Sequence, residues 1–164
     1  MKKIISLVLV LLTLTACGKK TVEPCLFGIS FIADIVYFNE SYKGECVFSE
    51  DGFLTFKITE PELLSGYTVT ISDDKITAEY LGLQFTPTEG NMPFSSVADT
   101  LFEKLTSASG GKAEKRGEQF ILEGDSYTLY ISESGLPQKM LIPDERFTVY
   151  FYNATAFSSG EGRH

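Results

Sequence analysis

From Phe27 onward the chain alternates apolar and polar residues with a period of two, and this pattern constrains the fold most. Side chains of a strand point alternately to the two faces of a sheet, so such alternation is typical of strands with one buried face. β-branched and aromatic residues fill most of the apolar positions, as strands prefer. The expected strands, about eight in all, are residues 27–38, 43–49, 54–58, 67–72, 76–80, 120–122, 127–131 and 147–151.

Turn-forming residues separate consecutive expected strands. They are Glu50-Asp51-Gly52, Asp73-Asp74-Lys75, Gly124-Asp125 and Glu133-Ser134-Gly135. Short connections of this kind join antiparallel neighbours, because parallel strands need long crossovers. The sequence therefore predicts a mainly β (α+β) domain with an antiparallel sheet.

One segment, residues 95–109, has a helical period instead. Its apolar stripe is Val97, Ala98, Leu101, Phe102 and Leu105. Ser96 and Asp99 have the spacing of a capping box, and Gly110-Gly111 follows as a stop signal. We expect one helix packed against the sheet.

The sizes of these elements do not match. About eight strands spaced ~4.8 Å apart make a sheet near 40 Å wide, whereas a helix of about fourteen residues is only ~20 Å long. The sheet must therefore curl over the helix, close on itself, or leave an apolar groove. The predicted groove wall consists of Phe56, Ile58, Val69, Ile71 and Tyr80 from the strands, with Leu101 and Leu105 from the helix.

The N-terminus has the organisation of an export signal. Lys2 and Lys3 precede an apolar run, Ile4 to Leu12, which is too short for the ~20 residues of a membrane span. Leu14-Thr15-Ala16-Cys17 resembles the lipobox of bacterial lipoproteins. That resemblance implies cleavage after Ala16 and lipidation of Cys17 with acyl chains, which anchor a protein stably when two or more are present. The alternatives are a plain secretory signal with an incidental cysteine, or an N-terminal span.

The charge of the chain excludes one class of partner. The formal net charge is −8, and it becomes −10 once residues 1–16, with Lys2 and Lys3, are removed. A strongly acidic domain repels nucleic acid and anionic head groups. We expect no nucleic-acid partner.

Catalytic and metal-binding patterns are missing from the sequence. His164, the last residue, is the single histidine, and the Asp73-Asp74 pair fits a solvated turn better than half of a cation site. We therefore predict a protein that is not an enzyme, with no catalytic residues, no metal and no cofactor. Four tyrosines near the C-terminus, Tyr127, Tyr130, Tyr150 and Tyr152, are interpreted as core filling, with an aromatic groove rim as the alternative.

Two further cysteines, Cys25 and Cys46, are expected to be free thiols. A hairpin turning at residues 39–42 places Cys46 opposite about Ile35, ten residues from Cys25 along the strand, or roughly 33 Å. A disulfide needs Cα atoms within about 7 Å.

The order of elements resembles a known group of proteins. Strands, the turn Pro61-Glu62-Leu63-Leu64-Ser65-Gly66, a hairpin leading to Tyr80-Leu81-Gly82-Leu83, one helix and more hairpins look like small Gram-positive lipoproteins with a LolA-like half-barrel. The resemblance implies a curved sheet, or half-barrel, with the helix in its concave face, where an acyl chain or a partner protein binds. The expected organisation is a signal peptide (1–16), a lipidated tether (17–26), a half-barrel domain (27–153) and a flexible tail (154–164).

Two functions follow from these patterns. The first is a lipoprotein on the extracytoplasmic face of the cell membrane that holds a lipid or other apolar ligand in the concave face. The alternative is a scaffold that tethers an envelope protein through a strand edge or the convex face.

Replacing the predicted anchor tests the lipobox. Cys17→Ser should leave the chain unprocessed, or release it from the membrane fraction of the host, because the acyl chains have no other attachment point. Fractionation and the mass of the chain measure this. Normal processing with full membrane retention would contradict the lipobox interpretation.

Overall fold

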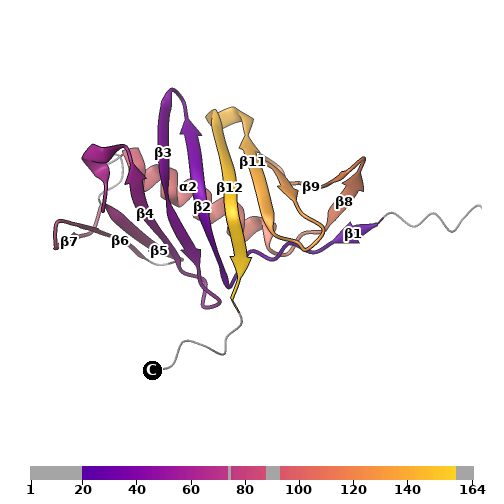
Figure 1. Ribbon diagram of the computed structural model, residues 1–164, viewed down its shortest axis with the longest axis horizontal. Coiled ribbons are helices and arrows are strands. Elements are labelled where there is room, and N and C mark those ends of the chain that lie inside the picture. Colours follow the sequence, from indigo (N-terminus) through magenta and orange to yellow (C-terminus); the bar gives the residue numbers. More distant parts are fainter. Residues whose placement is uncertain (1–19, 74, 88–92, 158–164) are drawn as a thin grey trace, which may run out of the picture.

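The computed structural model describes residues 20–73, 75–87 and 93–157 and contains one twelve-stranded antiparallel sheet with one α-helix against it (Figure 1). The strands are β1 (Thr21–Val22), β2 (Ile29–Tyr37), β3 (Glu40–Phe48), β4 (Leu54–Glu60), β5 (Thr68–Ser72), β6 (Lys75–Tyr80), β7 (Leu83–Phe85), β8 (Ala113–Arg116), β9 (Gln119–Glu123), β10 (Thr128–Ile131), β11 (Pro137–Ile142) and β12 (Phe147–Ala156). The helix is α2 (Pro93–Ala108), and two short 3₁₀ helices are η1 (Glu62–Leu64) and η2 (Pro143–Glu145).

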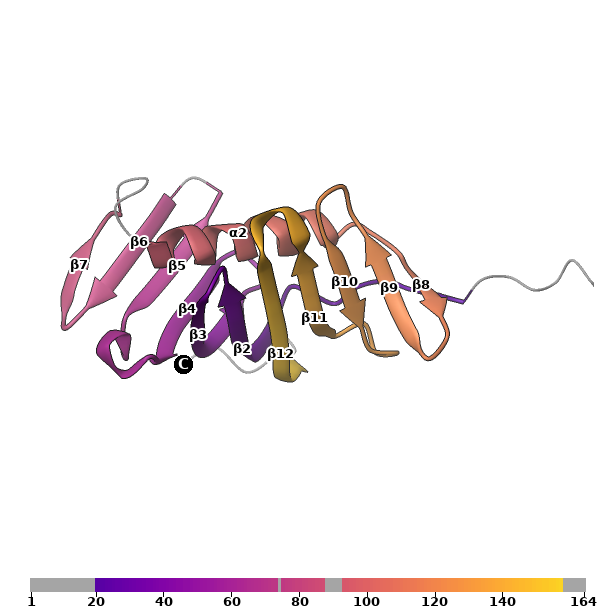
Figure 2. The same ribbon diagram turned by 90° about the horizontal axis from the view of Figure 1, so that it is seen from above.

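The sheet consists of two meanders joined in the middle. Its strand order is β1-β8-β9-β10-β11-β12-β2-β3-β4-β5-β6-β7, and every pair is antiparallel. Strands β2 to β7 form one meander and β8 to β12 the other, with β12 beside β2. Helix α2 follows β7 and precedes β8, so it connects the two outer regions of the sheet across one face (Figure 2).

The predicted alternation is confirmed, but the predicted strand number is too low. Each of the eight expected segments corresponds to a strand, with ends that differ by up to five residues, and the sequence did not predict β1, β7, β8 and β11. β1 and β7 have only two and three residues, which is too short to show a period. β8 is largely charged, and β11 begins with Pro137 next to a register shift in its pairing with β10.

The core lies between the sheet and α2. The expected stripe of Val97, Ala98, Leu101, Phe102 and Leu105 is buried, which confirms the helical period. The helix begins at Pro93, two residues before the expected start, because proline is favoured in the first turn. Ser96 therefore lies inside the helix and does not cap it. Within the described ranges, no helix has the length and apolar content needed to cross a bilayer.

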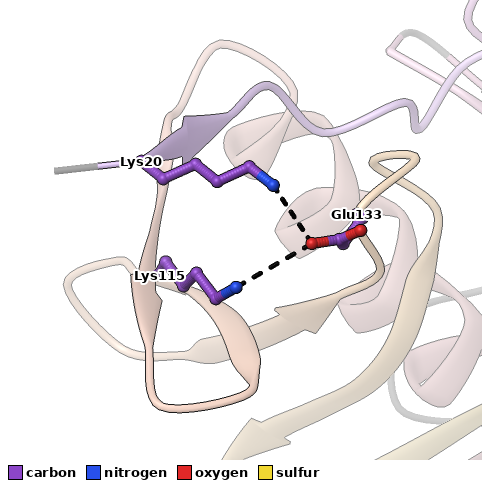
Figure 3. A network of polar contacts seen from close by, with 3 residues as sticks. All are labelled: Lys20, Lys115 and Glu133. Atoms are coloured by element: carbon purple, nitrogen blue, oxygen red, sulfur yellow. Dashed lines mark hydrogen bonds and ion pairs between the residues drawn. The ribbon is translucent and has the colours of Figure 1, made fainter.

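Residues 20–26 are part of the folded domain, and the predicted tether over 17–26 is wrong for them. Val22 pairs with Ala113, the Cys25 N–H donates to the Gly135 carbonyl at 2.9 Å, and Leu26 is 1% exposed. Lys20 and Lys115 both approach the Glu133 carboxylate, at 3.1 and 3.9 Å (Figure 3). Cys17 and the rest of residues 1–19 lie outside the described residues, as do Asp74 and His164.

The C-terminal boundary also differs from the expectation. β12 continues to Ala156, past the predicted end at residue 153, because Thr155 and Ala156 pair with Ser30 and Ile29 after a register shift.

Cys25 and Cys46 are both free cysteines, as predicted, although the register that led to this prediction was wrong. The turn between β2 and β3 is Phe38-Asn39, so Cys46 pairs with Phe31 and Tyr42 with Ile35. Burial raises the pKa of the Cys46 thiol well above its ordinary value. Cys25 contacts the turn between β10 and β11, which belongs to the meander that does not contain Cys46.

Gly44 in β3 marks a close approach between strands. A Cβ at this position would lie 2.3 Å from the Lys57 carbonyl oxygen and 2.8 Å from the Phe56 ring, next to a register shift with β4. Gly44→Ala should therefore lower the free energy of unfolding by about 1–3 kcal/mol through overpacking. Urea unfolding measures this, with Gly110→Ala as control because no atom lies within 4 Å of its added Cβ. Equal effects of the two substitutions would contradict the close approach.

Candidate functional site: an aromatic cavity near the edge of the sheet

A cavity of about 670 Å³ opens where the β2–β3 hairpin, η1, β6, β7 and the start of α2 meet. Its wall is apolar and aromatic over most of its area. The lining residues are Glu40, Ser41, Tyr42, Pro61, Leu63, Leu64, Tyr67, Tyr80, Phe85 and Phe94.

Phe94, in the first turn of α2, lies at the centre of the aromatic residues around this cavity. Its ring centroid is 5.2 Å from that of Tyr42, 5.8 Å from that of Tyr67 and 5.0 Å from that of Phe56. Tyr67 in turn contacts Tyr80 at 5.9 Å and Phe85 at 6.1 Å. Aromatic pairs at these separations stabilise the fold beyond the effect of their buried area. Because Phe56 is buried, its contact with Phe94 makes the cavity wall continuous with the hydrophobic core.

The loop after β4 forms another wall of the cavity. Its η1 turn is fixed to β6 by the Tyr80 hydroxyl, which donates to the Leu63 carbonyl at 2.9 Å. The Tyr67 N–H donates to the Leu64 carbonyl at 2.9 Å, which fixes the end of the turn. Both leucines can therefore face the cavity on a short, well-connected segment.

The inner face of the sheet, the face that α2 packs against, continues beyond the core at β6 and β7. Tyr80 pairs with Leu83 and Ala78 pairs with Phe85, so these four side chains share a face. Ala78 is buried, whereas Leu83 is 72% exposed. Leu63 in η1 and Leu81 in the β6–β7 turn are each 83% exposed. Apolar surface thus remains uncovered at this end of the molecule.

Six of the seven residues predicted for the groove wall lie elsewhere, in the packed core. Phe56, Ile58, Val69, Ile71, Leu101 and Leu105 are at most 1% exposed and fill the space between sheet and helix. Tyr80 alone of the seven lines the cavity. The helix and the sheet pack against each other where the sequence predicted the groove, and the uncovered surface lies further out, at β6 and β7.

The cavity residues that the sequence did not single out come from separate segments. Tyr42, Tyr67, Phe85 and Phe94 lie on three strands or their ends and on the helix, and they meet through tertiary packing. A usable signal was the turn 61–66, whose Leu63 and Leu64 are too apolar for a solvated loop.

The C-terminal tyrosines do not form a common rim. Tyr127 is buried, whereas Tyr150 and Tyr152 are exposed on the outer face of β12, since they alternate with buried Val149 and Phe151. The Lys139 ammonium lies 5.1 Å from the centroid of the Tyr150 ring.

Metal ligands are not gathered in the described part of the chain, where no group of three or more His, Cys, Asp or Glu residues has metal-binding geometry. A second cavity of about 630 Å³ lies between α2 and the ends of β5 and β6. Charged residues, among them Asp73, Lys75 and Glu103, line this second cavity, so it is a poorer site for an apolar ligand.

Glu40 and Tyr42 form the polar part of the candidate site. The Tyr42 hydroxyl donates a part-buried hydrogen bond to the Glu40 carboxylate. Burial first, and then the bond to Glu40 and its negative charge, raise the pKa of Tyr42 to about 12. At neutral pH the phenol keeps its proton, and the pair carries the single negative charge of Glu40.

Comparisons with known proteins add little to this description. No protein-family model and no curated protein matches the chain. Among solved structures, the chain is similar to an uncharacterized conserved protein from Thermus thermophilus, with a TM-score of 0.45 and 8% identity over 79% of this chain and 78% of that one. This similarity assigns no activity.

The Tyr42–Glu40 pair predicts a pH dependence of stability. Because the pKa of Tyr42 is higher in the folded chain, the contribution of its protonated form is complete below the ordinary value of 10.0 and is lost as pH rises to about 12. Glu40→Gln should bring the pKa of Tyr42 down, though not to 10.0, because burial remains. Absorbance titrations of the unsubstituted chain and of Tyr42→Phe are compared, because their difference reports the ionisation of this phenol. Ionisation of Tyr42 near its ordinary pKa of 10.0 in the unsubstituted chain would contradict the assignment.

Proposed function

We propose that this protein is a lipid-anchored, extracytoplasmic binding protein that holds an apolar ligand in the cavity beside β6 and β7. The observation that carries the proposal is the cavity itself. Small-molecule sites are typically concave, about 300–1,000 Å³ in volume and mostly apolar with few polar groups. A cavity of about 670 Å³ with five aromatic side chains and two leucines in its wall fits that description.

We also propose that the sheet and its helix form a half-barrel of the LolA-like kind, an arrangement that would leave room for a ligand. An open antiparallel sheet that packs one face on a single helix can curve around the helix and leave part of that face free. Twelve strands spaced ~4.8 Å apart span about 55 Å along the sheet, whereas α2, with 16 residues, is ~24 Å long. The uncovered part is where the cavity lies.

A lipid on Cys17 would hold the molecule in a defined orientation. Only two residues lie between Cys17 and Lys20, so the three steps along the chain span at most about 11 Å. Lys20 leads into β1, and β1 and β7 lie at opposite ends of the strand order (Figure 1). The anchored end of the domain would then face the membrane, and the cavity would face away from it.

We further propose a binding role without catalysis, because the cavity offers no activated nucleophile. Its polar side chains are Glu40, Ser41 and three tyrosines. Glu40, the one carboxylate among the described lining residues, accepts the Tyr42 hydroxyl and makes no hydrogen bond to the Ser41 hydroxyl, whereas acyl transfer or hydrolysis requires a base bonded to the nucleophile or a second carboxylate.

The scaffold alternative also has a specific observation in its favour. No strand in the described part of the chain pairs with the outer edge of β7, and neither charge nor proline protects its sequence Leu83-Gln84-Phe85. An extended segment of an envelope protein could add to this edge. Its side chains would then compete with a small ligand for the same cavity.

Adjacent positions in β7 test the proposal because they face opposite sides of the sheet. Phe85→Ser should weaken saturable binding of a neutral apolar fluorescent probe at least about tenfold, since burying an aromatic ring contributes about 1.5–3 kcal/mol. Gln84→Ser introduces serine on the opposite face of β7, so it should leave binding of the probe unchanged. The measurement is a fluorescence titration of the chain from residue 18 onward, which keeps every described residue.

Thermal unfolding of both variants provides the control for folding. Absence of saturable binding to the unsubstituted chain, or equal losses in the two variants, would contradict the binding role. Binding of a co-purified polypeptide that Phe85→Ser abolishes would favour the scaffold.

A further inference from the structure

The charge of the cavity wall is entirely negative. Glu40 is the one charged side chain among the described lining residues, and neither lysine nor arginine is among them. A fatty-acid carboxylate or a phosphate head group would meet no positive partner there. The remaining wall is aromatic, aliphatic or hydroxylic.

Glu40 has no positive partner of its own among the residues described. Its carboxylate accepts the Tyr42 hydroxyl, and the side chain is otherwise exposed at the cavity. Lys43, next to Tyr42 and on the other face of β3, instead lies 3.8 Å from Glu60. The negative charge of Glu40 is therefore open to a ligand.

The aromatic wall also favours positive charge. The faces of aromatic rings attract cations, and clusters of such rings are the known means of holding quaternary ammonium groups. Five rings line this cavity, those of Tyr42, Tyr67, Tyr80, Phe85 and Phe94. The carboxylate of Glu40 lies in the same wall.

One feature opposes a cation. The N-terminal end of α2 is close to the cavity, and a helix N-terminus carries a partial positive charge of about half a unit. The full negative charge of Glu40 exceeds it. In addition, Phe94 is the described residue of this helix end that lines the cavity, and its ring lies beside those of Tyr42 and Tyr67.

We propose that the cavity selects amphiphiles with a positively charged head, an amine or quaternary ammonium group on an apolar chain, over anionic ones such as fatty acids. This inference rests on the proposed binding function and specifies its ligand class. The apolar chain contacts Leu63, Leu64 and Phe85, and the head lies against the rings beside Glu40.

Three amphiphiles with the same dodecyl chain separate head-group choice from chain binding. Dodecyltrimethylammonium, dodecanoate and dodecyl maltoside, each below its critical micelle concentration, are titrated against the neutral fluorescent probe on the chain from residue 18 onward. The cation should displace the probe at a concentration at least about tenfold lower than the anion does, as expected for a desolvated cation–π contact combined with a carboxylate.

Glu40→Gln should reduce that preference about two- to fivefold by removing the charge, as expected for an ion pair with an exposed carboxylate. Binding of the neutral amphiphile should weaken less than binding of the cation, because the amide can still accept the Tyr42 hydroxyl. The matched control is Glu79→Gln, which removes the same charge from an exposed position of β6 beside Tyr80, on the opposite face.

The outcomes are distinct. A preference for the anion, equal binding of all three amphiphiles, or a cation preference that Glu40→Gln and Glu79→Gln reduce equally would overturn this inference and leave the apolar binding function standing. Failure of the probe and the neutral amphiphile to bind saturably would overturn both.

Discussion

The pairing of β12 with β2 holds the molecule together. It joins residues more than a hundred positions apart, from Phe147 against Tyr37 to Ala156 against Ile29, and makes one sheet from two meanders. Contacts across the inner face reinforce it: the Phe31 and Phe151 rings lie 5.1 Å apart, and Tyr37 and Phe147 lie 5.9 Å apart. Such long-range pairing carries a large loop-closure cost, so it depends on the buried apolar rows on both strands.

The helix is the second constraint, because its position decides which part of the inner face is left open. Helix α2 begins at Pro93, and its central residues Leu101 and Leu105 have no exposed surface. Near the start of the helix, the Phe94 ring contacts aromatic residues of the sheet such as Phe56. Further out on the same face of the sheet, Leu83 is largely exposed. A helix ~24 Å long cannot cover a sheet of twelve strands. The cavity is thus a consequence of element sizes.

The chemistry of the cavity follows from what surrounds that open end. The β2–β3 hairpin brings Glu40 and Tyr42 there, and η1 brings two leucines. The result is a wall that combines rings, aliphatic side chains and one carboxylate. Under the proposed binding function, this single carboxylate makes charge the simplest basis of selection among amphiphilic ligands.

The sequence by itself determined the strand alternation, the position of the helix and its buried stripe, and the mismatch between helix and sheet. These depend on local periodicity, which survives in a one-dimensional pattern. The tertiary structure alone decided the number of strands, the β12–β2 junction and the site. Short strands such as β7 show no period, and β1 gains its identity only by pairing with β8. Phe56 and Val69 were predicted to line a groove because the sequence does not show which part of the sheet the helix covers. Phe85 and Phe94 come together only when segments distant in the sequence fold against each other.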